Sequence, residues 1–366
     1  MLQFHVDMKL LFDARYIRTN HHDGISRFSA ELAASLFRIT PVVFLIHDVN
    51  QLTKLPDNCD YLIIHNPTSI KEPLTSLILN RYKPDVVFSP MQTMGSFGRR
   101  FKLILTLHDM IYYKFRTPPK YFNPIIRFGW WLYHLTYIPQ RITLNSADMV
   151  ATVSETSKQS ILGAKLTKRQ VIVIPNAPQD LTDQLTVPLS NKSEPINIVY
   201  MGSFLEYKNV ETLIKATKYL KNHTLHLLSG ITPNRMAELD SLRPKGAKVV
   251  FHNGVTDQEY ANILADRSVL VMASRDEGYG LPIAEALAMG VPTVVSDIPI
   301  FHEVAGDGAL YFNPDSAQDL ANKIKSLSDD KLRQNLIKQG SKHISQYNWD
   351  KSAHKLLSAI KSSLLQ

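Results

Sequence analysis

The chain has 366 residues, of which 44% are apolar, so its length and composition suit two domains of ordinary size. Lysine and arginine number 41 against 33 aspartates and glutamates, and the resulting charge of +8 predicts an anionic partner: a nucleic acid, a lipid headgroup or a phosphorylated substrate. The single cysteine, Cys59, excludes an intrachain disulfide and a cysteine-based zinc cluster, and it favours a reducing compartment.

Membrane insertion and export have no support in the sequence. No uncharged apolar run approaches the roughly 20 residues that span a bilayer. No signal-peptide pattern is recognisable, because the apolar residues after Met8 lead at once to Asp13 and Arg15. We therefore expect a cytoplasmic protein that is either soluble or peripheral on the inner face of the cell membrane.

In the first half of the chain, short apolar runs alternate with segments of helical character. The runs are nearly continuous, as in parallel strands that are covered on both faces. A doubly wound α/β domain is therefore expected over residues 1–177. The expected strands are 9–13, 42–46, 61–64, 85–89, 103–107, a run that begins at 147, and 171–174.

Two positions in this half are candidates for ligand contact. Gly24 precedes a helix expected to run through Phe37, and a glycine there forms either a phosphate-facing turn or a simple helix cap. His108 and Asp109 follow the strand at 103–107, at the edge where ligand groups gather in such sheets. A metal at residues 21–23, His-His-Asp, is not expected, since adjacent histidines cannot easily face one ion.

A second domain follows a polar segment. Residues 178–195 contain three prolines and little periodicity, which predicts a linker. A second α/β domain is expected over residues 196–347, and a C-terminal helix over 348–366. Strands are expected to begin at 196, 225, 249, 269 and 292.

Residues 274–285 are the most informative stretch. They read Ser-Arg-Asp-Glu-Gly-Tyr-Gly-Leu-Pro-Ile-Ala-Glu and place Glu277 and Glu285 on either side of a glycine-containing turn that enters a helix. Gly278 and Gly280 permit positive φ, so the amides of residues 279–281, Tyr279 to Leu281, would face a phosphate at the helix N-terminus. The same pattern fits an ordinary strand-to-helix turn with two solvated glutamates.

The full wording of residues 277–292, Glu-Gly-Tyr-Gly-Leu-Pro-Ile-Ala-Glu-Ala-Leu-Ala-Met-Gly-Val-Pro, closely resembles the Glu-x7-Glu signature of glycosyltransferase family 4. This family consists of retaining enzymes with the GT-B fold. The resemblance implies two Rossmann-like doubly wound domains that face an interdomain cleft, with the donor in the cleft. It also implies that Glu285 binds the ribose and Glu277 the sugar, with His108 near the sugar and Gly24 near the diphosphate.

The segment after residue 200 carries the cations for the donor diphosphate in the resembling family. Gly202 and Lys208 match its pattern, whereas Ser203 and Tyr207 stand where arginine is frequent. The resemblance therefore implies a diphosphate site with one fewer cation, unless Arg275 or Arg27 replaces it. Asp-x-Asp is absent from the sequence, so we expect no metal and no cofactor beyond the donor, a GDP- or UDP-linked sugar.

The expected function is the transfer of a sugar, with mannose preferred, to a glycan or a lipid-linked acceptor with retention of configuration. Residues 118–141 interleave aromatic and basic side chains. This composition suits peripheral contact with an anionic membrane surface, and it equally suits a helix whose Trp130, Trp131 and Tyr133 pack in the core. No nucleic-acid motif accompanies them. The alternatives are a non-catalytic nucleotide-sugar-binding protein and a GT-B sugar-nucleotide epimerase or phosphorylase.

Overall fold

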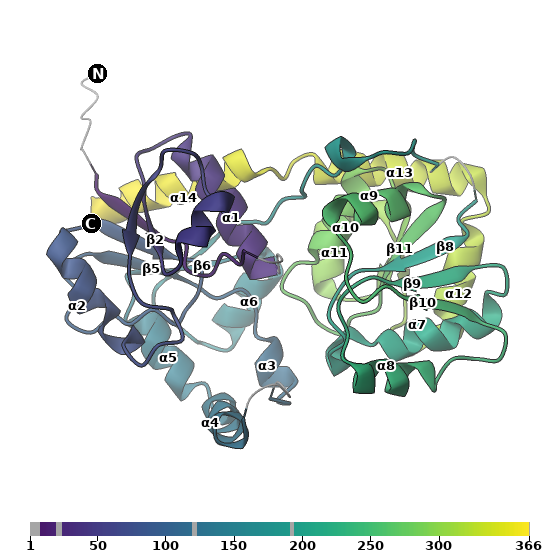
Figure 1. Cartoon of the computed structure of the whole chain (residues 1–366), viewed down its shortest axis with the longest axis horizontal. Helices are drawn as coiled ribbons and strands as arrows, with labels where there is room; N and C mark the ends of the chain where they lie inside the picture. Colours follow the sequence, from purple (N-terminus) through teal and green to yellow (C-terminus); the bar gives the residue numbers. More distant parts are fainter. Residues whose placement is uncertain (1–7, 20–23, 119–122, 191–193, 366) are drawn as a thin grey trace. The chain divides into compact units, whose positions relative to one another are not determined.

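A computed structural model describes residues 8–19, 24–118, 123–190 and 194–365. The chain divides into two compact units, which are described separately. Unit 1 comprises Met1–Asn176 with Asn348–Gln366, and unit 2 comprises Ala177–Tyr347. Each unit is built on one parallel sheet (Figure 1).

Unit 1 contains a seven-stranded sheet in the order β3-β2-β1-β4-β5-β6-β7, with every pair parallel. The central strands β1 and β4 are buried along their whole length. Phe12 packs there against Phe44 and Phe88, with ring centroids 5.9 and 5.2 Å apart. The strands are β1 (Leu10–Asp13), β2 (Val43–Ile46), β3 (Asp60–Ile63), β4 (Val86–Ser89), β5 (Lys102–Thr106), β6 (Met149–Thr152) and β7 (Gln170–Val173).

The helices of unit 1 include the last helix of the chain, which packs against the first. The Trp349 ring at the start of α14 meets the Phe28 ring of α1, with centroids 6.1 Å apart. The helices are α1 (Gly24–Phe37), α2 (Thr75–Leu79), α3 (Ile111–Lys114), α4 (Pro124–Leu135), α5 (Ile138–Asn145), α6 (Glu155–Gly163) and α14 (Trp349–Leu364), with 3-10 turns η1 (Val49–Lys54), η2 (Glu72–Leu74) and η3 (Asn80–Tyr82).

Unit 2 contains a six-stranded parallel sheet in the order β10-β9-β8-β11-β12-β13. Helices α7, α8 and α12 cover one face, and α9, α10, α11 and α13 cover the other (Figure 1). The strands are β8 (Asn197–Tyr200), β9 (Thr224–Leu227), β10 (Lys248–Phe251), β11 (Ser268–Met272), β12 (Thr293–Ser296) and β13 (Leu310–Phe312). The helices are α7 (Val210–Ala216), α8 (Pro233–Asp240), α9 (Asp257–Ala265), α10 (Leu281–Ala288), α11 (Pro299–Ala305), α12 (Ala317–Ser326) and α13 (Asp330–Ile344), with 3-10 turns η4 (Thr182–Gln184), η5 (Glu206–Lys208), η6 (Thr217–Tyr219) and η7 (Gly306–Gly308).

The expected doubly wound α/β architecture is confirmed, and the strand starts agree with the prediction to within two residues. Strand β13 was missed because three residues are too short to show a pattern. The expectation that all strands are covered on both faces was wrong for β3, which lies at the sheet edge and exposes Tyr61 and Ile63. The segment at 178–195 was expected as a linker, and its described part packs on α9: Ser190 N donates to Ala265 O at 2.8 Å.

A buried ion network fixes the carboxyl end of β1. Arg15 is only 2% exposed, and its guanidinium lies between two carboxylates. Nε and Nη2 donate to Asp13 at 2.7 and 3.0 Å, and Nη1 and Nη2 donate to Glu72 at 2.7 and 2.9 Å. His65 Nε2 donates to Glu72 Oε2 at 3.0 Å. The network therefore ties the end of β1 to the turn η2, which lies far along the chain.

We predict that Arg15→Met lowers the free energy of unfolding by about 3–5 kcal/mol, because it leaves the carboxylates of Asp13 and Glu72 buried without a cation. Arg38→Met is the matched control. Arg38 pairs with Asp350 at the surface, where both side chains are more than half exposed, so its loss is expected to cost no more than about 1 kcal/mol. Urea unfolding of both variants measures the difference, and equal small losses would contradict a structural role for the network.

Candidate functional site

Two loops of unit 2 lie at the carboxyl edge of its sheet. They follow β8 and β11, which are adjacent and parallel, so the loops leave the sheet on the same side. The first covers residues 201–209 and ends in the 3-10 turn η5, Glu206–Lys208. The second covers residues 273–280 and leads into α10. All of the candidate residues in the second half of the chain except Leu281 and Glu285 lie on these two loops.

Hydrogen bonds fasten the two loops to each other. Arg275 N donates to Tyr207 O at 2.8 Å. Asn209 Nδ2 donates to Ala273 O at 3.1 Å and to Pro314 O at 2.8 Å. The backbone of Asn209 is left-handed, with φ of 56°, a conformation that asparagine tolerates better than most residues. The relative position of the loops is therefore set by buried contacts.

Lys208 and Glu277 form an ion pair between these loops. Lys208 Nζ lies 2.5 Å from Glu277 Oε1, and their side chains are only 13% and 9% exposed. Ser274 Oγ donates to the same oxygen at 2.7 Å. Within the described part of the chain, Glu277 Oε2 accepts no hydrogen bond. The pair thus places an ammonium group and a carboxylate oxygen side by side at the edge of the sheet.

The start of α10 lies next in the chain, and its shape requires glycine at Gly280. The φ of Gly280 is +106°, and a Cβ there would lie 3.1 Å from Ile283 Cδ1 and 3.2 Å from Phe301 Cε1. Gly280 is the N-cap of α10, and Leu281 is its first residue. The first amides of any helix lack partners within the helix, so this end suits an anion.

Tyr279 and Glu285 are both buried. The Tyr279 ring is 4% exposed and meets the Tyr347 ring edge to face, with centroids 6.4 Å apart. Burial raises the pKa of the Tyr279 hydroxyl above its usual value. Only the backbone of Tyr279 is therefore suited to contact a ligand. Glu285 lies on the second turn of α10 and is 3% exposed.

Gly202 and Ser203 contribute to the shape of the first loop. Gly202 N donates to Ser229 Oγ at 3.0 Å, and Tyr200 Oη donates to Ser203 O at 2.6 Å. A Cβ on Gly202 would lie 2.9 Å from Tyr200 Oη, so the loop closes over this hydroxyl only with glycine at that position. The Gly202 amide thus already has a partner within unit 2.

Gly24 and His108 belong to unit 1. Gly24 is the first residue of α1, whereas the sequence analysis placed it just before the helix. His108 Nε2 donates to Pro90 O at 2.8 Å, and the Phe28 ring of α1 meets the imidazole edge to face at 5.1 Å. The structure therefore brings α1 and His108 together. Asp109 Oδ1 accepts from Ile111 N at 3.0 Å at the start of α3.

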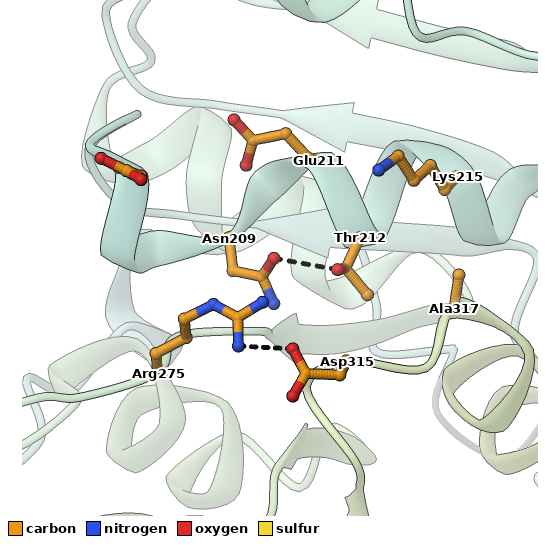
Figure 2. A pocket seen from close by; sticks show the side chains of 8 residues that line it. Asn209, Glu211, Thr212, Lys215, Arg275, Asp315 and Ala317 are labelled. Carbon is orange, nitrogen blue, oxygen red and sulfur yellow. Dashed lines mark hydrogen bonds and ion pairs between the residues drawn. The ribbon is translucent and has the colours of Figure 1, made fainter.

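Arg275 was one of two candidates to supply the missing cation, and its guanidinium is directed elsewhere. It pairs with Asp315 at 2.6 Å in a polar pocket of about 390 Å³ (Figure 2). Asn209, Thr212 and Lys215 also line this pocket, whereas Glu277 and Glu285 do not. The other candidate, Arg27, is on α1 in unit 1.

Sequence reasoning missed Arg235, which braces the first loop from α8. Its Nε donates to Phe204 O at 3.0 Å, and its guanidinium pairs with Glu211 and with Glu238. The only signal in the sequence was a proline two residues earlier that opens a helix, which carries no information about the loop. The contact depends on how α8 lies on the sheet.

Among the described residues, no three histidine, cysteine or acidic side chains gather in a way that would hold a metal ion. Residues 21–23 lie outside the described residues. In the described ranges, no helix combines the length and apolar character that crossing a bilayer requires.

Two family models match consecutive parts of the chain. The model of glycosyl transferases group 1 matches residues 182–343, and the model of Glycosyltransferase Family 4 matches residues 70–177. The chain is 29% identical over 215 residues to the O-antigen chain mannosyltransferase RfbU of Salmonella typhimurium, covering 57% of this chain and 58% of that protein. It is 27% identical over 240 residues to O-antigen chain mannosyltransferase B of Escherichia coli, covering 60% of this chain and 62% of that protein.

The fold is similar to that of a solved structure over nearly the whole chain. Anabaena HepE, in complex with UDP and glucose, matches with a TM-score of 0.73 at 19% identity, covering 97% of this chain and 100% of that one. The matches to the two mannosyltransferases span about three fifths of the length of those relatives. From the two family models and the pair of parallel α/β units, we conclude that the chain belongs to the glycosyltransferases of family 4 type, with the GT-B fold.

Proposed function

We propose that the chain is a retaining glycosyltransferase that moves a hexose from a nucleotide sugar to a glycan or a lipid-linked acceptor. The observation that carries this proposal is the Lys208–Glu277 pair, held between two loops beside the start of α10. A cation, a helix N-terminus and a carboxylate oxygen in one place match a ligand with a diphosphate and sugar hydroxyls.

Lys208 and the first turn of α10 would stabilise the leaving diphosphate. The bond between the anomeric carbon and the diphosphate oxygen breaks, and negative charge develops on that oxygen. Because Lys208 has three donor hydrogens, it can keep its contact with Glu277 and still donate to a phosphate. Preorganised donors of this kind supply much of the rate in such reactions.

Glu277 and Glu285 would position the donor. Glu277 Oε2 is suited to accept from a sugar hydroxyl, and Glu285 is proposed to accept from the ribose. His108, on unit 1, is proposed to contact the sugar. The acceptor oxygen attacks from the face that the diphosphate leaves, and its proton passes to a phosphate oxygen of the leaving group, so no covalent enzyme intermediate is needed.

Mannose is the preferred sugar in this proposal, because the relatives RfbU and mannosyltransferase B are named as O-antigen mannosyltransferases. Their names also support an acceptor that belongs to a cell-envelope glycan. The donor base stays open between guanine and uracil, since HepE was solved with UDP and glucose. A lipid-linked acceptor implies that the protein works at the inner face of the membrane, as a peripheral and not a spanning protein.

We predict that one nucleotide sugar, GDP-mannose first, binds and is consumed only when an acceptor from membrane extract is present. Calorimetry with a panel of GDP- and UDP-sugars measures binding, and NMR of the product measures the anomeric configuration. Retention is the expected outcome, and an inverted centre would exclude the front-face route. Consumption without an acceptor indicates an epimerase, and a requirement for phosphate indicates a phosphorylase.

Lys208→Met is expected to lower kcat by about 10² to 10³, because one preorganised charge is lost from the leaving group. Arg275→Met is the matched control, since Arg275 lies in the same motif but pairs with Asp315. It should change kcat by less than about tenfold. Equal losses in the two variants would contradict the assignment of the diphosphate cation to Lys208.

Glu277→Gln keeps the size of the side chain and removes its charge. We expect kcat to fall by about 10² or more while the folded structure persists, because Ser274 can still donate to the amide oxygen. Donor binding by calorimetry and thermal unfolding accompany the rate measurement. A Glu277→Gln variant with unchanged turnover would instead support a binding protein in which this carboxylate has no catalytic part.

The proposed reaction needs no metal, since Lys208 and the α10 start neutralise the diphosphate. Turnover is therefore expected to persist in EDTA. Loss of turnover in EDTA and its return with Mg²⁺ would contradict this part of the proposal. Rates measured before and after dialysis against the chelator provide the comparison.

A further inference from the structure

Helix α4 (Pro124–Leu135) has no buried side chain, although most of its residues are apolar. One side of the helix contacts the rest of unit 1. The Trp130 ring meets the Tyr112 ring edge to face, with centroids 5.1 Å apart, and Tyr133 Oη donates to Gln140 Oε1 of α5 at 3.1 Å. These contacts orient α4 and leave its other side to the solvent. Figure 1 shows α4 at the periphery of unit 1, away from the sheet.

The other side of α4 is apolar. Ile125, Phe128 and Leu132 follow helical spacing, and Ile125 and Phe128 are 84% and 61% exposed. Phe128 stacks on Trp131, with ring centroids 6.1 Å apart. Exposed apolar residues continue on α5. We define the α4–α5 surface as the side chains of six exposed residues: Ile125, Phe128, Trp131, Leu132, Ile138 and Ile142. Gathered apolar side chains of this kind on a protein surface mark a contact with a partner.

Basic side chains flank the α4–α5 surface on both sides. Lys114 and Arg116 are exposed at the end of α3, which packs against α4. Lys165 and Arg169 are exposed next to α5: Arg141 of α5 donates to Lys165 O at 3.1 Å, and Arg169 donates to Asn145 O at 2.9 Å. From residue 110 to residue 147 the sequence contains no acidic residue. The segment that carries the α4–α5 surface therefore has only basic charged residues.

Three kinds of partner can be compared by their chemistry. A second copy of the chain would bring like charges together around the same surface, which disfavours association. A nucleic acid would satisfy the cations and aromatic rings, but it offers nothing to Ile125 and Leu132. An anionic bilayer accepts apolar side chains among its acyl chains and cations at its headgroups.

We infer that the α4–α5 surface docks unit 1 on an anionic bilayer. Ile125 and Phe128 enter the acyl boundary, Trp131 lies at the headgroup level, and the flanking lysines and arginines contact lipid phosphates. The inference deepens the proposed function, because a lipid-linked acceptor would be met at this surface. Docking itself requires neither donor nor transfer, so the two proposals can fail separately.

The test is sedimentation of the full chain with vesicles of phosphatidylglycerol and phosphatidylcholine, and with vesicles of phosphatidylcholine alone. The unaltered protein is expected to bind the anionic vesicles, less so as salt is raised. The double variant Ile125→Ser with Phe128→Ser should bind at least about tenfold more weakly, because the apolar area that enters the bilayer is lost.

Ile70→Ser with Phe97→Ser is the matched control. It removes the same two residue types from positions that are 95% and 74% exposed and lie outside α3, α4 and α5. This control should bind vesicles like the unaltered protein. Thermal unfolding checks that both variants are folded. Tryptophan fluorescence gives a second readout: Trp349 is buried and Trp130 packs on Tyr112, so a blue shift on binding reports Trp131.

Several outcomes would overturn the inference. The first is that the unaltered protein does not bind anionic vesicles, and the second is that it binds neutral vesicles equally well. The third is that the double variant Ile125→Ser with Phe128→Ser, the α4 variant, binds anionic vesicles as well as the unaltered protein does. Self-association that disappears in the α4 variant, without vesicle binding, would assign the surface to a second copy. Calorimetric donor binding should be the same in both variants. If donor binding fails in the unaltered protein as well, the proposed function falls while the vesicle result stands.

Discussion

The candidate site depends on one ion pair that joins two loops. Lys208 and Glu277 lie 69 positions apart in the sequence and 2.5 Å apart in the structure, with little access to water. Each charge in such a place stabilises the other, since one charge alone would lack both its counter-ion and full hydration. The loops after β8 and β11 must therefore keep their relative position, and the hydrogen bonds of Asn209 and Arg275 N hold them there.

The surrounding backbone serves the same constraint. Gly280 enters α10 through a left-handed conformation in a space that a Cβ would crowd, and Gly202 closes its loop over the Tyr200 hydroxyl. The main role of these two glycines is to allow the backbone shape of the two loops. The site is thus built from backbone geometry and one charge pair, which suits a reaction in which the main task is to stabilise a departing diphosphate.

The proposed transfer site and the proposed membrane-docking surface lie on different units of the chain. The proposed diphosphate site lies on unit 2, where the polar groups are partly buried and mutually paired. The α4–α5 surface lies on unit 1, where apolar side chains are exposed and the flanking groups are cationic. Exposure of apolar area is unfavourable in an isolated soluble protein, so the α4–α5 surface indicates a partner that covers it.

The sequence by itself determined the α/β class, the strand starts, the entry into α10 and the family. These features depend on local patterns: apolar runs, and a glycine and a proline at a helix start. Tertiary structure alone decided that Arg275 pairs with Asp315, that Arg235 braces the loop after β8, that Tyr279 is buried, and that α4 presents its apolar side to solvent. Each of these outcomes depends on which side chains from distant segments reach the same place. The local spacing of residues in a sequence does not tell how far apart such segments lie in the folded chain.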